Sequence, residues 1–433
     1  MKARVSFSLL AIAITSAANA QATDPFVFVA NDGNLEGSVS SMRVCPDGTT
    51  TLVDRVITGS RSSTTQPCAG CNAFAIDLSP DGSHLAVNHA SGSNPEQVTI
   101  IRVDTNGSLT IVEEFTLAEA GLDIGWVRDD LLAVCITTLS GTNTLRLFQW
   151  DANAESLTPT DSDGAGTFLT SITVHPTGDW IYTNDSFGSV VRRFDVAGNS
   201  ASLGDTTALP VSGVSLEVSP DGRFLYAAGG ISAGGNAFAG FSIDPSTGDL
   251  TVIPGSPFNS PGSSPKGFAF SSNSAYMYVS HGSDATIQAF AIDPESGMPM
   301  FNGESFDVGL QGTLQGMDTI PGFLFALDES DSFDGLEGVY SFAIDAGTGA
   351  FPPVTGTPVL TDGISPSAIS AWGGAACAAD LAEPFGTLNF FDIAEYIALF
   401  NAGDPAADLA DPAGILNFFD IAEFIALFNA GCP

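Results

Sequence analysis

The chain has 433 residues, of which 49 are acidic and 12 are basic, so its formal net charge at pH 7 is −37. Lys266 is the only lysine after Lys2. This balance excludes nucleic acid as a partner, because nothing would neutralise phosphates, and it disfavours acidic lipid surfaces. The charge itself favours solubility over a specific cation-binding role.

The first twenty residues have the pattern of a secretory signal peptide. Lys2 and Arg4 are followed by the apolar run Val5–Ile14 and by Ala18-Asn19-Ala20, a small-residue cleavage site. No later stretch offers the roughly 18 unbroken apolar residues of a membrane helix. We therefore expect a mature protein without a membrane span, secreted or held at the cell surface, with the periplasm as a further possibility.

A repeated unit of four short strands follows, and residues 213–253 are its cleanest copy. Strands are predicted at Val214–Val218, Phe224–Ala227, Phe238–Ile243 and Leu250–Ile253. Pro220 and Gly222 occupy the second and fourth positions of the first turn, where they favour chain reversal. One such sheet exposes two faces, so it must stack on copies of itself.

The repeat recurs along the chain at a period in the forties. Pro176 and Pro220, in equivalent turns, are 44 residues apart, and Pro80 and Pro176 are 96 apart, which is two units. This period with four strands per unit is typical of a β-propeller. Seven blades are predicted, at residues 26–59, 72–117, 121–160, 168–207, 213–253, 265–305 and 314–355.

The ends of the repeat region predict how the ring closes. The first unit, starting at Phe26, lacks an opening strand, and residues 365–372 form an opening strand with no successors. We expect this segment to complete the first blade, because closure removes exposed sheet edges. The predicted fold class is thus an all-β seven-bladed propeller over residues 21–375, with a small α-helical domain after it.

Residues 376–433 form that second domain, which contains a duplication. Asp380 recurs as Asp408 and Asp392 recurs as Asp420, 28 residues later in both cases. Apolar residues recur at helical spacing after each Phe-Phe-Asp, and Asn401-Ala402-Gly403 resembles a helix C-cap. Two loop–helix units are therefore predicted.

Four of the six cysteines are predicted to pair. Export makes disulfides possible. Cys68 and Cys71 are expected to form a local bridge, since no βαβ context supports a redox centre. Cys377 and Cys432 flank the duplication and are expected to form a disulfide that joins its ends.

The repeats resemble the lactonase-like seven-bladed propellers, which include YVTN-repeat proteins and bacterial 6-phosphogluconolactonases. The residues that carry the resemblance are LSPDGSHLAVNHA (78–90), VHPTGDWIYTND (174–185), VSPDGRFLYAAG (218–229) and YMYVSHGSDATIQAFAIDPESG (276–297). The resemblance implies the propeller fold over about 350 residues and, less specifically, lactone hydrolysis.

The C-terminal segment resembles dockerin modules, which carry two EF-hand-like calcium loops and dock onto a cohesin-like partner. The resemblance implies calcium ligands at Asp380, Asn389, Asp392, Asp408, Asn417 and Asp420. Ala382 and Ala410 replace an oxygen ligand, and Pro384 and Pro412 interrupt the loops. Since calcium requires six to eight oxygens, we expect weak binding or none. The alternative is a helical hairpin held by its Phe/Ile core and a disulfide.

Polar side chains are predicted to gather at one mouth of the propeller channel, where opening strands start and second strands end. These are Asn31, Asp32, Asn72, Asn88, His89, Asn184, Asp185, Lys266, His281, Gln315, Asp328 and Glu329. A histidine beside a carboxylate could form an acid–base pair or hold a metal. The candidate catalytic residues are His281, Asp185, Asn184 and His89, although water in any propeller channel also favours polar side chains.

Two functions follow from these patterns. In phosphogluconolactonase-like enzymes we expect an Arg-His pair followed by Asn-Glu, whereas this chain has Thr170-Ser171 followed by Asn184-Asp185. The first hypothesis is therefore an exported, non-catalytic binding propeller that its dockerin-like tail anchors to a cohesin-like or cell-surface partner. The alternative is an extracytoplasmic lactone hydrolase, and the negative charge disfavours phosphorylated substrates.

Overall fold

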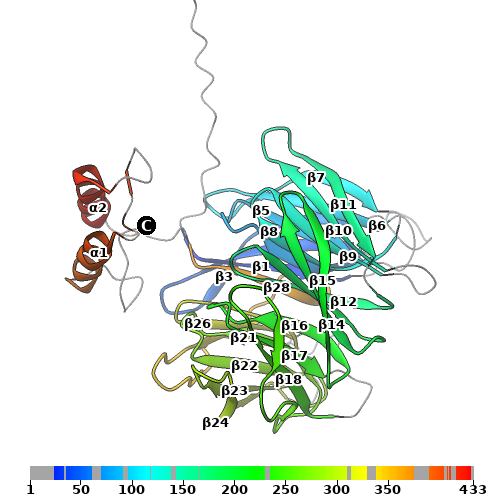
Figure 1. The fold of residues 1–433 in the computed structure, drawn as a ribbon. Coiled ribbons are helices and arrows are strands. Elements are labelled where there is room, and N and C mark those ends of the chain that lie inside the picture. The colour runs from blue at the N-terminus through cyan, green and yellow to red at the C-terminus, as the bar shows by residue number, and fades with distance from the viewer. Residues whose placement is uncertain are drawn as a thin grey trace, which may run out of the picture.

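The computed structural model describes residues 24–33, 36–60, 70–90, 96–117, 119–137, 143–164, 166–229, 235–309, 314–328, 338–374, 390–403, 407, 409–410 and 416–430. The predicted signal peptide lies outside this set. Seven antiparallel sheets are arranged around one axis (Figure 1). The predicted seven-bladed β-propeller is confirmed.

Each blade contributes one strand to the central channel. These innermost strands are β4 (Ala73–Leu78), β8 (Gly121–Arg128), β12 (Leu169–Val174), β16 (Gly213–Val218), β21 (Pro265–Phe270), β25 (Leu314–Ile320) and β28 (Pro366–Trp372). Each contacts the innermost strand of the next blade, and β28 contacts both β25 and β4. The ring is therefore closed.

The remaining strands extend each sheet outward by antiparallel pairing. The second strands are β1 (Phe26–Asn31), β5 (His84–His89), β9 (Leu131–Ile136), β13 (Trp180–Asp185), β17 (Phe224–Gly229), β22 (Tyr276–His281) and β26 (Phe323–Asp328). The third strands are β2 (Glu36–Val44), β6 (Glu96–Val103), β10 (Thr144–Asp151), β14 (Val190–Ala197), β18 (Ala237–Ile243), β23 (Thr286–Ile292) and β27 (Gly338–Ala343).

The outer strands are the least regular part of the blades. They are β3 (Thr50–Ser60), β7 (Leu109–Leu117), β11 (Ser156–Gly164), β15 (Ser200–Ala208), β19 (Leu250–Val252) and β24 (Pro299–Asp307), and the short β20 (Phe258–Asn259) joins the fifth blade. In the seventh blade, isolated bridges from Val359 and Pro353 to β27 stand where the others have an outer strand.

The predicted ring closure is confirmed by the first blade, whose order is β28-β1-β2-β3. Phe26 pairs with Trp372 and Val29 pairs with Ile369. In Figure 1 the orange β28 accordingly lies beside the blue β1. Chain segments more than 300 residues apart thus complete one sheet.

Aromatic side chains at the start of second strands bind the turn of the next blade. The Tyr226 hydroxyl donates a hydrogen bond of 2.6 Å to the carbonyl oxygen of Gly297. Gly297 has a φ of 69°, and a Cβ there would overlap the ring of Phe224. Tyr182 makes the matching bond to Gly248 at 2.8 Å. The turn glycines therefore serve packing between blades as well as chain reversal.

The C-terminal segment contains the two predicted helices, α1 (Phe390–Ala402) and α2 (Phe418–Ala430). Their contact centres on Tyr396 and Phe424, whose rings stack with centroids 4.0 Å apart. Gly403 has a φ of 73° and its amide binds the carbonyl oxygen of Phe400, which confirms the predicted C-cap.

Candidate functional site

The sheet register brings the predicted mouth residues to one end of the channel. Pro265 at the start of β21 pairs with His281 at the end of β22, Leu169 pairs with Asp185, and Ala73 pairs with His89. The starts of innermost strands and the ends of second strands therefore lie at the same face, as predicted. The environment of each side chain decides what it can do there.

Asp185 is buried and is surrounded by hydrogen-bond donors. Its carboxylate accepts bonds from the Thr167 amide and hydroxyl and from the Phe168 and Gly188 amides, at 2.7–3.1 Å, and pairs with Arg192 at 3.0 Å. Burial alone would raise the pKa of Asp185, but these donors outweigh it and lower the pKa to about 2. This carboxylate fastens a loop and is a poor proton acceptor.

His281 is likewise buried and held at both ring nitrogens. Nδ1 lies 3.1 Å from the carbonyl oxygen of Thr286, which can only accept, so Nδ1 carries the proton. Burial lowers the pKa of His281, and its Nε2 lies 2.7 Å from Ser260 Oγ, which also lies 3.1 Å from Gln288 Oε1. The side chain of His281 is 0% exposed, which separates it from any substrate in the channel.

His89 repeats this arrangement in the second blade. Its Nδ1 lies 3.3 Å from the carbonyl oxygen of Cys71 and its Nε2 lies 2.9 Å from Thr99 Oγ1. Burial lowers the pKa of His89 to about 4. Two blades thus use the same histidine position to bind a backbone carbonyl and a hydroxyl, which indicates a structural role.

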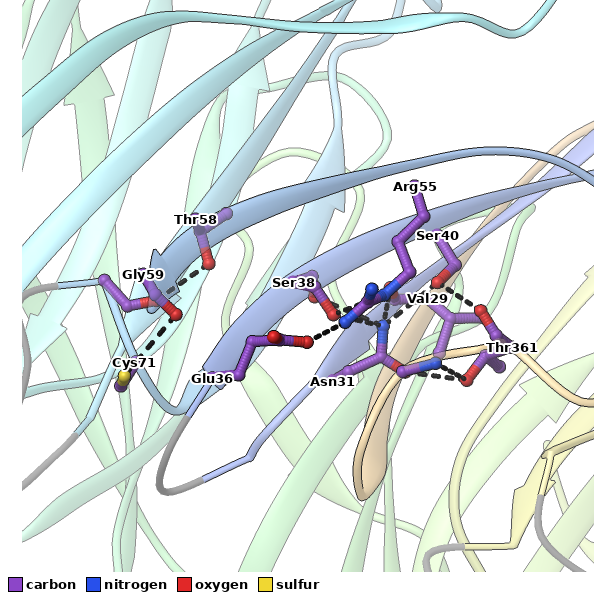
Figure 2. Close-up of polar contacts among 12 residues, drawn as sticks. Val29, Asn31, Glu36, Ser38, Ser40, Arg55, Thr58, Gly59, Cys71 and Thr361 are labelled. Atoms are coloured by element: carbon purple, nitrogen blue, oxygen red, sulfur yellow. Dashed lines mark hydrogen bonds and ion pairs between the residues drawn. The ribbon is translucent and has the colours of Figure 1, made fainter. Parts of the chain in front are cut away.

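The asparagines at this face bind neighbouring segments. Asn184 Nδ2 donates to Thr170 Oγ1 at 3.0 Å. Asn31 accepts a 2.8 Å bond from the Thr361 hydroxyl and donates to Ser40 Oγ at 3.1 Å, so it ties the segment before β28 to the first blade (Figure 2).

The other mouth residues fall into two groups. Asn88 and Asp328 are fully buried, and Asn72 is 9% exposed; Asp32 and Lys266 are partly exposed. Glu329 and the side chain of Gln315 lie outside the described residues. The catalytic role of His281, Asp185, Asn184 and His89 stays a prediction, and their burial favours structural roles.

A β-bulge re-aims one residue near the start of the innermost strands. The register skips between Ala73 and Ala75 and between Pro265 and Gly267, so Phe74 and Lys266 are displaced from the ladder. The residues displaced in this way that line the channel are Phe74, Leu122, Thr170, Val214, Lys266 and Ser367. We call these six residues the rim.

Beyond the rim, the innermost strands enclose a cavity of about 730 Å³. Five of its lining residues are charged: Lys266 at the rim, and Asp77, Asp123, Glu217 and Asp318 further in. Asp77, Glu217 and Asp318 pair with the residue three before the end of their second strand, so they share one level. That level lies about 10 Å along the strand from the rim.

Three of the four carboxylates also join neighbouring blades. Asp77 accepts a 2.6 Å bond from the Trp126 amide of β8, Asp123 accepts a 2.7 Å bond from the Ile172 amide of β12, and Asp318 accepts a 2.7 Å bond from the Ala371 amide of β28. Each also accepts the amide of its own next residue.

Glu217 differs from the other three carboxylates. Among the described residues no hydrogen bond reaches its side chain, which is one methylene longer than an aspartate. Thr173, at the same level in β12, accepts the Val218 amide at 3.2 Å and so replaces a carboxylate in joining the blades. Glu217 is thus the channel carboxyl best placed to bind a ligand.

These carboxyl groups are less acidic than usual. Burial raises the pKa of Asp77 and of Asp123 to about 7 and that of Asp318 to about 6, against the backbone amides that lower it. Burial, and then the charges of Asp318, Asp77 and Asp123, raise the pKa of Glu217 well above its ordinary value. The three aspartates therefore change charge near neutral pH, and Glu217 holds its proton more strongly than an ordinary glutamate does.

These four carboxyl groups were not among the residues predicted from the sequence. A pattern in the sequence could have identified them. The fifth residue of the innermost strand, which is Asp77 in the second blade and Glu217 in the fifth, is charged and lines the channel. Among the described residues, no cluster of three or more His, Cys, Asp or Glu side chains is suited to a metal ion.

The helical segment was tested for the calcium that its resemblance implies. Asp420 is 0% exposed, and its carboxylate accepts the Leu409, Ala410 and Asn417 amides at 3.0, 2.8 and 2.6 Å. Oxygens engaged by three donors do not fit a calcium ligand. Asp392 is also buried, while Asp380, Asn389 and Asp408 lie outside the described residues.

The predicted disulfides cannot be followed in the same way, since Cys68, Cys377 and Cys432 lie outside the described residues, and both pairs stay predictions. Cys71 is buried beside the Gly59 carbonyl oxygen (Figure 2). No described helix is long and apolar enough to cross a membrane.

Comparison with known proteins supports this architecture. The family model described as lactonase, 7-bladed beta-propeller, matches residues 211–315, which include Glu217 and Lys266. No curated protein matches the chain.

Similar solved structures include a periplasmic gluconolactonase of Pseudomonas aeruginosa, PpgL, with 18% identity and a TM-score of 0.60, covering 81% of this chain and 100% of that one. A protein of Bacteroides uniformis described as a candidate 6-phosphogluconolactonase has 15% identity and a TM-score of 0.64, with the same coverage. At these identities the similarity shows the fold alone, which is a seven-bladed propeller.

Proposed function

We propose that the protein is a lactone hydrolase whose reaction takes place in the propeller channel. The match of the lactonase family model and the two similar propellers support this alternative better than the non-catalytic binding function predicted first. The observation that carries the proposal is Glu217, a partly exposed carboxyl group in the cavity that no described residue binds. The reacting groups are therefore placed below the rim, at the level of Glu217.

The chemistry requires one acid and one base, and environments that separate two carboxyl pKa values supply them. The two amides that bind Asp318 oppose its burial, so its pKa rises only to about 6 and it is ionised at neutral pH. The pKa of Glu217 is raised well above its ordinary value by burial and neighbouring charges, which keeps its proton in place. Ala269 lines the intervening blade at the same level and leaves room for a substrate between the two.

A water molecule attacks the lactone carbonyl carbon while Asp318 accepts its proton. The ring carbon–oxygen bond breaks, and Glu217 donates its proton to the departing ring oxygen. The product is an open-chain hydroxy acid, and the carboxylates return to their starting state by proton exchange with solvent. General acid–base catalysis of this kind contributes about 10²–10⁴-fold to a rate.

A lactonase assay with a panel of γ- and δ-lactones tests the proposal. We expect turnover by the wild type and a loss of about 100-fold or more in kcat for Glu217→Gln, which keeps the shape of the side chain. Glu304→Gln, on the exposed outer strand β24, is the matched control and should retain activity. A wild type that hydrolyses no lactone, or a Glu217→Gln variant with full activity, contradicts the proposal.

We also propose export and anchoring, which rest on the sequence patterns alone. The signal-peptide pattern of residues 1–20 supports export, and the duplicated tail supports docking onto a cohesin-like or cell-surface protein. Purification of the mature N-terminus from the exported fraction checks the first. A pull-down with the full chain and with a chain lacking residues 376–433 checks the second, since equal capture by both contradicts anchoring through the tail.

A further inference from the structure

The charged groups of the channel disfavour the binding of anions. Among the described residues, the charged residues that line the cavity are Lys266, Asp77, Asp123, Glu217 and Asp318. Strands β12 and β28 contribute no titratable side chain to the lining. The four carboxyls outnumber the one cation, and the chain as a whole carries a net charge of −37. An anion therefore meets a repulsive field on approach and inside.

The same cavity offers hydrogen bonds to an uncharged polar ligand. Ser215 and Thr319 line it and are partly exposed. Thr170 and Ser367 add two more hydroxyls at the rim. Hydroxyls and carboxylates that converge in a cavity suit the hydroxyl groups of a sugar.

We propose that the channel admits uncharged polyhydroxy lactones and excludes anions, so that the carboxylate formed by hydrolysis is expelled, with Asp77 and Asp123 setting this selectivity. The inference rests on the proposed function and adds a substrate class and two specificity-determining residues to it. Neither Asp77 nor Asp123 takes part in the proton transfers. They act on bound charge through the field, because Asp77 lies at the level of Glu217 and Asp123 lies two residues nearer the rim.

The selectivity should increase with pH. The pKa of Asp77 and of Asp123 is raised to about 7, chiefly by burial, so both groups gain negative charge between pH 6 and pH 8. Affinity for an anion should therefore fall as pH rises, whereas affinity for a neutral ligand of the same shape should change little.

Equilibrium binding to ligands that are not turned over tests this directly. The probes are an aldonolactam, its 6-phosphate and the corresponding aldonate. We expect the wild type at pH 8 to bind the lactam at least about tenfold more tightly than either anion, since one unit charge a few ångströms away in a protein interior alters affinity by about that factor. Equal affinities, or no binding of the lactam, overturn the inference.

The chain itself supplies a variant that removes charge and keeps the fold. Thr173 shows that a threonine at this level can accept the amide of the next blade, so Asp77→Thr should preserve the bond to Trp126. We expect this substitution to reduce the ratio of the affinity for the lactam to the affinity for the aldonate by about fivefold or more. Glu304→Gln loses the same charge on the outer surface and should leave this ratio unchanged. A folded Asp77→Thr protein with the wild-type ratio contradicts the assignment.

Turnover is measured separately, so the two proposals fail in different ways. A protein that hydrolyses lactones but binds the aldonate as tightly as the lactam overturns the charge selection and leaves hydrolysis standing. A protein that prefers the lactam but hydrolyses no lactone overturns hydrolysis and supports the selection.

Discussion

The polar residues at the channel mouth and those inside the channel show two opposite uses of a buried carboxylate. Asp185 at the mouth accepts five contacts, one from an arginine, and its pKa falls to about 2. Asp77 inside the channel accepts two amides, and its pKa rises to about 7 because burial outweighs them. The balance between burial and the number and charge of the donors separates a structural carboxylate from one suited to proton transfer.

The largest effect on stability is expected from the removal of the Asp185 carboxylate. Asp185→Ala leaves Arg192 and three backbone amides without their acceptor, so we expect a loss of about 3–5 kcal/mol in the free energy of unfolding. Urea denaturation measures it. Glu295→Ala, in an exposed turn, is the control and should change stability by less than about 0.5 kcal/mol. Lost turnover with unchanged stability would instead support the catalytic role predicted from the sequence.

The contribution of the channel carboxyl groups to stability should fall as pH rises, whereas that of Asp185 should fall as pH decreases. The pKa of Asp77 is 3.8 for the ordinary group and about 7 in the fold, so the folded state binds more protons between these values. Its contribution to stability is complete below about pH 4 and is lost as pH rises through 7.

Asp77→Thr should therefore flatten the pH profile. Between pH 5 and pH 7.5 we expect the wild type to lose up to about 2 kcal/mol more than the variant, at about 1.4 kcal/mol per pH unit for one fully linked proton. Denaturation midpoints measured across this range check it. Parallel profiles would show that burial does not disfavour the charged form of Asp77.

The sequence predicted the blades well because turns and alternation are local. The Pro220–Gly222 turn and the orphan strand at 365–372 were enough to predict seven blades and the closed ring. The carboxyl groups inside the channel were missed for a geometric reason. Alternation along the strand separates Glu217 from the buried Leu216 and Val218. Only the assembled ring shows that the face bearing Glu217 borders a cavity.

The mouth residues lie at one end of the channel for the reason that the sequence suggested, and their catalytic role stays a prediction. Antiparallel pairing places His281 and Lys266 at the same face, as predicted. What the sequence cannot supply is the set of partners, since Ser260 and Thr286 reach His281 only after the loops fold. The bulge that turns Lys266 toward the channel is a register shift, which residue types alone do not reveal.

His281 gives a smaller test of the same comparison. His281→Ala and Ser260→Ala each remove one side of a buried hydrogen bond, so each should cost about 1–3 kcal/mol, with a coupling energy of about 1 kcal/mol in the double mutant. Urea denaturation of the four proteins measures the cycle. We expect kcat toward a lactone to change less than threefold, and a loss of 100-fold in a stable His281→Ala protein would return the histidine to the catalytic site.

The smallest expected effect concerns calcium in the helical segment, where Asp420 resembles Asp185 and not Asp77. Three amides already occupy its oxygens, and Ala410 stands where a calcium loop has an oxygen ligand, so a cation would have to displace bonds worth about as much as it gains. We expect millimolar calcium to change the unfolding free energy of the full chain by less than about 0.5 kcal/mol, and chelator to have no effect on its far-UV circular dichroism. A calcium-dependent rise in helix content that Asp420→Asn abolishes would show that the amide contacts give way to the metal.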